Sequence, residues 1–322
     1  MNDELSRRRI EKLTDKAIAF LGEANHQAAL EVADDLAGEK APLAFYIAGQ
    51  AYAGMNDLKS AVGTMRRGVL RRPSFWVNWF YLGIFLGKVG RKKEALAAYN
   101  QALSCPLVDA DVVRLNVAIL LVECREFEAA LTALAAIDNA SMRWGVDGTR
   151  VLALEGVGRF AEATDLGERF LEERPEGDEE YGKRVGYVAA ALARIRLQQG
   201  RGREDVRGFL LQCLEEYGCS APLLHEITNL NPLRYSKDAK YFRFVIDVRL
   251  PQSHPWYRQT PGYFVIYDVV SDTEPGALEL IREFENPTGF ESLQVVDCKV
   301  REERPEDPMG VYWVTERIFP NL

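Results

Sequence analysis

An interval of 34 residues recurs along the chain between residues 45 and 171. Small residues keep this interval in four successive segments, at Ala61, Ala95, Ala129 and Ala163. Two apolar columns keep it as well: Val69, Leu103, Ile137 and Leu171, and Tyr52, Leu86, Leu120 and Leu154. A fixed period of this length is typical of repeat proteins, in which each unit buries its apolar face against its neighbours. The period therefore predicts an elongated stack of similar units.

Each unit has the residue spacing of two helices. In the clearest unit, apolar and small residues recur at intervals of three and four in two stripes: Trp79, Leu82, Gly83 and Leu86, and then Ala95, Tyr99, Ala102 and Leu103. This is the spacing of a helix and not the alternation of a strand. The breaker Gly90-Arg91-Lys92 lies between the stripes. We expect an antiparallel helix pair, with the small Gly83 and Ala95 at the crossing.

The pattern resembles the tetratricopeptide repeat. The best match is Trp79-x2-Leu82-Gly83-x2-Leu86-x8-Ala95-x3-Tyr99-x2-Ala102. The unit from Phe45 to Pro73 matches nearly as well, whereas in the two later units Asn116 and Arg150 replace the usual Leu and Asp147 replaces the aromatic residue. The resemblance covers about residues 40–175, and flanking segments at about 5–38 and 180–218 continue the pattern. It implies an α-solenoid of five or six tetratricopeptide-type helix pairs.

The helical period stops after about residue 220. Residues 241–250 alternate between apolar and polar side chains, which predicts a half-buried strand, and residues 262–270, 292–302 and 310–318 read as three more strands. Pro275 suits the first turn of a helix between the second and third strands. The predicted order is β-β-α-β-β, a small antiparallel sheet with one helix on one face. We therefore expect two domains, a helical repeat domain at 1–220 and a small α+β domain at 221–322.

Composition narrows the classes of function. The chain has 40 Lys and Arg against 48 Asp and Glu, and this net charge of −8 opposes binding to nucleic acid. No apolar stretch approaches the roughly 18 residues of a membrane span, and the charged N-terminus lacks a signal sequence, so a cytoplasmic location is expected. The histidines are scattered along the chain and no two cysteines form a CxxC pair, so we expect neither a metal site nor a cofactor. The cysteines are expected to be buried reduced thiols. The cysteines are Cys105, Cys124, Cys213, Cys219 and Cys298.

The resemblance also implies a binding face, because the first helix of each pair lines a concave groove in this family. By register, the groove residues are Tyr46, Gln50, Val77, Phe80, Ile84, Asp111 and Arg114. These positions are mostly apolar, with Arg114 as the one strong cation, so an amphipathic helix or an extended apolar segment is favoured over a carboxylate as the ligand. We expect a non-enzymatic scaffold or adaptor that binds a protein or peptide in this groove.

Three alternatives stay open at this point. The C-terminal domain could be a small catalytic or ligand-binding module, with a polar pocket near Asp247, Asp268 and His254, that the repeats target. The chain could be a self-associating structural homo-oligomer. The groove could also be filled by the protein's own parts, such as the C-terminal sheet, because a contiguous apolar surface is rarely left bare.

Overall fold

The structure is a computed structural model. It describes residues 2–175, 177–218, 220–230, 235–254, 257, 260–285, 289–301, 307–315 and 318. The chain divides into two compact units, Met1–Ser141 and Met142–Leu322, and each is described here by itself.

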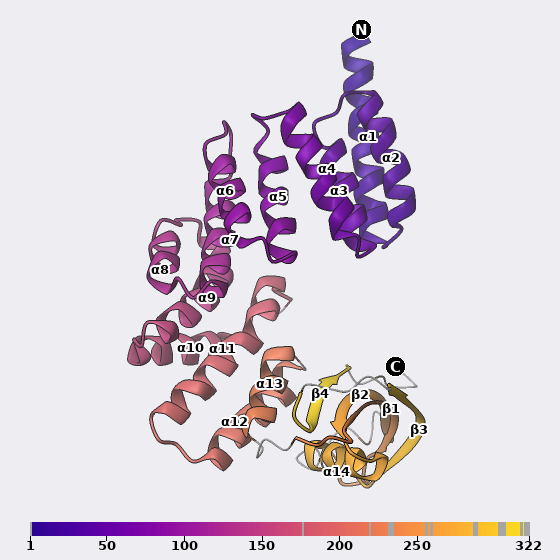
Figure 1. Cartoon of the computed structure of the whole chain (residues 1–322), viewed down its shortest axis with the longest axis vertical. Coiled ribbons are helices and arrows are strands. Elements are labelled where there is room, and N and C mark those ends of the chain that lie inside the picture. The colour runs from indigo at the N-terminus through magenta and orange to yellow at the C-terminus, as the bar shows by residue number, and fades with distance from the viewer. Residues whose placement is uncertain are drawn as a thin grey trace. The chain divides into compact units, whose positions relative to one another are not determined.

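The first unit consists of helices packed as antiparallel pairs (Figure 1). They are α1 (Asn2–Gly22), α2 (His26–Gly38), α3 (Ala44–Gly54), α4 (Leu58–Arg71), α5 (Trp76–Lys88), α6 (Lys92–Leu103), α7 (Ala110–Glu123) and α8 (Phe127–Ala135). The pairs are α1 with α2, α3 with α4, α5 with α6 and α7 with α8. The predicted helix pairs are thus confirmed in this unit. The first helices of successive pairs also touch one another more extensively than the second helices do.

Close approach within a pair depends on glycine. A Cβ atom added at Gly83 would lie 2.6 Å from the ring of Tyr99, and one added at Gly49 would lie 3.0 Å from Met65. In both pairs a large side chain of the second helix therefore packs directly onto the backbone of the first. Ala95, which was expected at the crossing with Gly83, is fully buried.

The 34-residue register slips by one residue in the pair formed by α7 and α8. Helices α4, α6 and α10 begin three residues before Ala61, Ala95 and Ala163, which are all fully buried. Helix α8 instead begins at Phe127, so Ala130 takes the buried position and Ala129 is exposed. In this helix the 34-residue interval therefore falls one residue before the buried position. One residue turns a helical side chain by about 100°, which moves it off the contact face.

The second unit contains further helices and a sheet (Figure 1). Its helices are α9 (Arg143–Gly156), α10 (Phe160–Glu173), α11 (Glu179–Gln198), α12 (Arg203–Tyr217), α13 (Ala221–Leu230) and α14 (Glu274–Glu285). Its strands are β1 (Lys240–Arg249), β2 (Gly262–Ser271), β3 (Ser292–Arg301) and β4 (Gly310–Val314). The predicted order β-β-α-β-β is confirmed.

The sheet is antiparallel with the strand order β3-β1-β2-β4. Phe244 of β1 lies opposite Tyr267 of β2, and Ile246 lies opposite Val265. All four side chains are buried in the same cluster as Ala277 and Ile281 of α14, and α14 packs on β2. The alternation along β1 therefore indicated the correct buried face.

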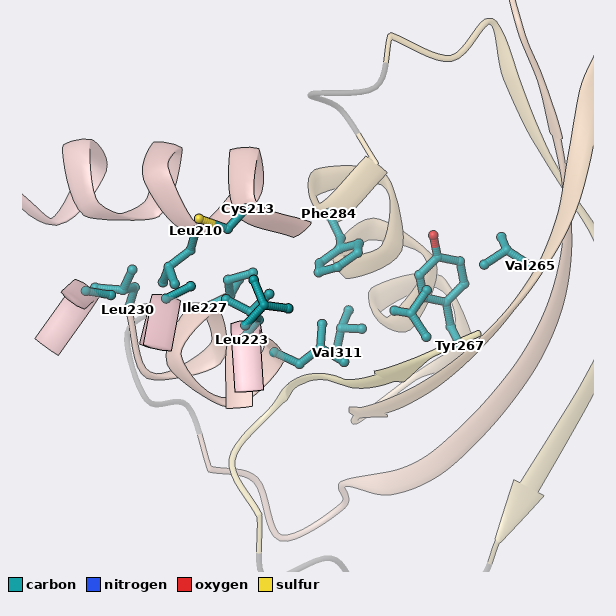
Figure 2. Packing of buried hydrophobic residues seen from close by; sticks show 14 of the residues in the cluster. Leu210, Cys213, Leu223, Ile227, Leu230, Val265, Tyr267, Phe284 and Val311 are labelled. Atoms are coloured by element: carbon teal, nitrogen blue, oxygen red, sulfur yellow. The ribbon is translucent and has the colours of Figure 1, made fainter. Parts of the chain in front are cut away.

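Helix α13 was not expected, because the helical period was taken to end at about residue 220. Leu223, Leu224 and Ile227 lie on one face of this short helix and are buried. The helix packs on α11, on α12 and on β4, and its Thr228 hydroxyl lies 2.9 Å from the carbonyl oxygen of Val311. One hydrophobic cluster thus runs from α12 through α13 to the sheet (Figure 2). A segment of ten residues is too short for its periodicity to stand out in the sequence.

Candidate functional site

The first helices of the second and third pairs carry most of the predicted binding residues. Tyr46 and Gln50 lie on α3, Val77 and Ile84 lie on α5, and all four side chains are half-buried. The ring of Tyr46 packs on the ring of Tyr81 across the contact between α3 and α5, with centroids 4.6 Å apart. The two helices therefore present a shared, partly exposed surface of aromatic and aliphatic groups.

Phe80 does not belong to this surface. Only 5% of it is exposed, and its ring lies between Trp76 and Tyr99, with centroid distances of 5.8 and 6.0 Å. It packs into the seam between α5 and α6, where a partner cannot reach it. The expectation that Phe80 lines the binding face is thus corrected.

Tyr81 takes the place that was assigned to Phe80. Val77, Tyr81 and Ile84 are spaced by four and then three residues, so they form one stripe along α5. The spacing alone did not distinguish Tyr81 from Phe80, because Val77, Phe80 and Ile84 are spaced by three and then four residues and fit a helical stripe equally well. Burial, followed by the neighbouring Tyr46, raises the pKa of Tyr81. Its hydroxyl therefore stays neutral, and it can contribute hydrogen bonds but not charge to a contact.

Asp111 and Arg114 are engaged within the protein. Arg114 donates to Asp111 at 3.1 Å and to the carbonyl oxygen of Ala136 at 3.0 Å. Asp111 also accepts from the backbone N–H of Asn139 at 3.2 Å. Together the two side chains hold the segment that follows α8 against α7. This explains why an ion pair stands at positions where the face is otherwise apolar.

The carboxylates proposed for a catalytic pocket lie apart on the sheet. Asp247 accepts from Arg249 at 2.6 Å, and Asp268 forms a two-pronged ion pair with Arg243 at 2.7 and 2.6 Å. Asp247 lies opposite Phe264, four positions along β2 from Asp268. Each carboxylate therefore has its own arginine partner, and the two do not form an acid–base pair. His254 follows β1 in the connection to β2.

The cysteines include one thiol that is well shielded from solvent. Cys105, Cys124, Cys213 and Cys298 are free, Cys213 alone among them is buried, and Cys219 lies outside the described residues. Burial raises the pKa of Cys213 to about 12, so this thiol is protonated and unreactive at neutral pH. In the described ranges no three His, Cys, Asp or Glu side chains come together as metal ligands. None of the helices in those ranges combines the length and the apolar composition that a membrane span requires.

Comparison with solved structures identifies the fold. A tetratricopeptide repeat protein from Parabacteroides merdae superimposes with a TM-score of 0.54 at 13% identity, over 69% of this chain and 86% of that one. The type IV pilus biogenesis factor PilW gives 0.52 at 17% identity, over 66% of this chain and 96% of that one. A chain of the APC/C hetero-tetramer Cut9–Hcn1 also gives 0.52, at 13% identity, over 66% of this chain but 41% of that one. The helical part of this chain has the tetratricopeptide-repeat fold. No family model and no curated protein matches the sequence.

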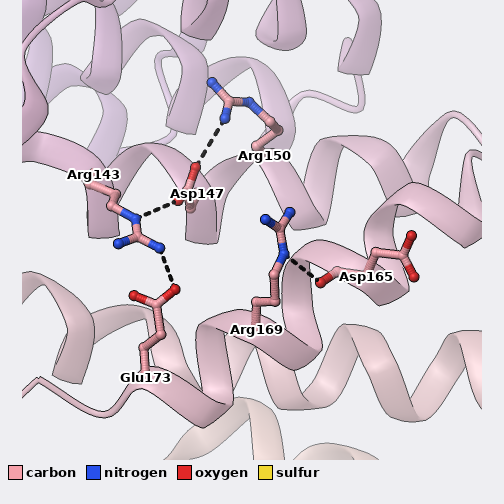
Figure 3. Close-up of polar contacts among 6 residues, drawn as sticks. All are labelled: Arg143, Asp147, Arg150, Asp165, Arg169 and Glu173. Carbon is pink, nitrogen blue, oxygen red and sulfur yellow. Dashed lines mark hydrogen bonds and ion pairs between the residues drawn. The ribbon is translucent and has the colours of Figure 1, made fainter.

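The first repeat of the second unit carries a larger cluster of ion pairs on its first helix. Asp147 of α9, which stands where the repeat usually has an aromatic residue, accepts from Arg143 at 3.3 Å and from Arg150 at 2.9 Å (Figure 3). Arg143 also donates to Glu173 of α10 at 2.5 Å. The aromatic packing expected at this tetratricopeptide position is thus replaced by a charged cluster. The accessible aromatic and aliphatic face described above belongs to α3 and α5.

Proposed function

We propose that the chain is a protein-interaction scaffold and that it binds a polypeptide through α3 and α5. The binding surface, which we call the apolar stripe, consists of Tyr46, Gln50, Val77, Tyr81 and Ile84. The observation that carries this proposal is the packing of Tyr46 on Tyr81, which joins the partly exposed edges of two successive repeats into one surface.

The chemistry of the apolar stripe favours an amphipathic helix or an extended apolar segment as the partner. Its members are uncharged, and the nearest predicted cation, Arg114, is bound to Asp111 and Ala136. Tyrosines give a large contact area at a low cost in side-chain entropy and keep a hydroxyl for hydrogen bonding, which makes them frequent at protein interfaces.

A substitution in the stripe tests this function. We expect Ile84→Asp to lose the protein partners that the wild-type chain captures from its native cells, since a charge at the centre of an apolar contact loses its water on binding. Quantitative proteomics of the captured proteins is the measurement. The matched control is Ile18→Asp, because Ile18 is an isoleucine on α1 of the same unit and is 51% exposed.

The comparison between the two variants decides the outcome. A partner that Ile18→Asp retains and Ile84→Asp loses supports the stripe. If both variants capture the same proteins in the same amounts, with circular dichroism showing both folded, the proposal is wrong.

A further inference from the structure

A second surface of the first unit lies at one end of its helix pairs, and none of the residues of the apolar stripe lines it. It is a hollow of about 860 Å³ at the three connections that join the four successive helix pairs. Its lining includes residues 40–42 between α2 and α3, residues 71–76 from the end of α4 to the start of α5, and residues 106–107 between α6 and α7. We call it the loop-end hollow. Its volume lies in the range of ligand pockets.

Three cations line the loop-end hollow, namely Lys40, Arg71 and Arg72, and its lining includes no Asp or Glu. Arg72 donates to the carbonyl oxygen of Lys40, which ties the first two connections together. Arg66 and Arg91 of the same unit, by contrast, both face Glu94. In the described part of the chain, Lys40, Arg71 and Arg72 form no ion pair. These three cations therefore form a positive cluster whose charge no carboxylate in the lining of the hollow offsets.

Apolar groups are interspersed with these cations. Phe45, Phe75 and Trp76 line the hollow together with three prolines and Leu107. Leu107 is 97% exposed, although a leucine side chain gains about 2 kcal/mol from burial. The connection in the middle is held in place, because the carbonyl oxygen of Pro73 accepts from the indole N–H of Trp79 at 2.8 Å. The surface is therefore ordered and at the same time leaves apolar area uncovered.

We propose that the loop-end hollow binds an acidic polypeptide segment that carries at least one bulky apolar side chain. The carboxylates supply the counter-charges that Lys40, Arg71 and Arg72 lack, and the apolar side chain covers Leu107 and Trp76. A chain in extended conformation suits the site, because the cations and apolar groups are distributed over three consecutive connections and not around one point. Charge pairing of this kind also raises the rate of association. The proposal does not depend on the apolar stripe, since no residue of the stripe lines the hollow.

The test uses the full chain and random peptides displayed on phage. The peptides are about twelve residues long and span about 40 Å when extended. After selection on the wild-type protein, we expect enriched sequences in which Asp and Glu flank a bulky apolar residue. Their affinity, measured by fluorescence anisotropy with the synthetic peptides, is expected to fall about tenfold or more with Arg71→Glu and with Leu107→Asp. Because Leu107 is almost fully exposed, the second variant keeps the test valid if the first fails to fold.

Two controls separate this site from general charge attraction and from the apolar stripe. Lys59→Glu makes the same change of charge on α4 as Arg71→Glu, at the other end of the helix, and is expected to leave the affinity unchanged. Ile84→Asp is expected to leave it unchanged too. Failure to enrich any peptide, enrichment of peptides without acidic residues, an equal loss with Lys59→Glu, or displacement by inorganic phosphate alone would each overturn the proposal.

Discussion

At the scale of single residues, the distance between the two helices of a pair depends on whether a glycine of one helix faces a large side chain of the other. Gly83 and Gly87 lie one helical turn apart on α5, but only Gly83 faces the partner helix. A Cβ atom at Gly83 would lie 2.6 Å from Tyr99, whereas one at Gly87 would find its nearest neighbour, Leu120, at 3.9 Å. The same substitution should therefore have opposite effects at the two positions.

Gly83→Ala is expected to lower the free energy of unfolding by about 2 kcal/mol, because the added methyl group forces the Tyr99 ring away from its packed position. Gly87→Ala is expected to raise it by up to about 1 kcal/mol, because alanine restricts the unfolded chain and favours a helix. Chemical denaturation of both variants is the measurement. Equal effects of the two substitutions would contradict the packing of Gly83 on Tyr99.

At the scale of elements, Arg194 links three helices of the second unit. From α11 it forms a two-pronged contact with Glu155 of α9, at 2.6 and 2.7 Å, and a third bond to Glu226 of α13 at 2.7 Å. Burial lowers the pKa of Arg194, but the hydrogen bonds to the two glutamates outweigh this and raise it. The unexpected helix α13 is therefore fixed to the repeats by charge as well as by its leucines.

Removing the arginine alone should leave two shielded carboxylates without their partner. We expect Arg194→Met to destabilise the protein by about 2 kcal/mol, less than for a fully buried pair because the guanidinium is partly exposed. The triple variant with Glu155→Gln and Glu226→Gln is expected to recover most of this loss, because its amides carry no charge. Thermal unfolding followed by circular dichroism compares the three proteins. A triple variant less stable than Arg194→Met would argue against a charge effect.

At the scale of the whole molecule, hydrophobic burial follows the two compact units. Two clusters in the first unit belong to α1–α7, whereas one continuous cluster in the second unit extends from α9 through α13 to the sheet and α14. Leu210 of α12 lies in the same cluster as Leu223 of α13 and Val311 of β4 (Figure 2). Truncation of the chain after α12 therefore divides the hydrophobic cluster of the second unit, whereas truncation near residue 141 separates the two units.

Two fragments make this difference measurable. The fragment 1–141 is expected to be helical and monomeric, because it keeps its own clusters intact. The fragment 1–220 is expected to self-associate, because it loses the cover that α13 gives to α11 and α12. Light scattering with circular dichroism distinguishes them. Should 1–220 be monomeric and as stable as the full chain, α13 and the sheet would not be part of that core.

Much of the architecture could be predicted, because it depends on local patterns. The 34-residue period and the stripes around Trp79 and Ala95 predicted the helix pairs, and the alternation from Phe242 to Val248 predicted β1 and its buried face. The binding face was predicted less well. Phe80 and Tyr81 are adjacent aromatic residues of similar size, and only the rotation of α5 about its axis decides which one enters the seam.

Sequence patterns alone were enough to predict the repeat, the four strands and their order along the chain, and the negative net charge, because periodicity and composition can be read without knowing how the elements pack. The tertiary structure decided the exposure of Tyr81, the engagement of Asp111 and Arg114, the place of α13 and the gathering of Lys40, Arg71 and Leu107 in one hollow. These features join residues that are distant in the chain, or depend on a rotation of a fraction of a turn. Such relations arise only when the helices pack against one another.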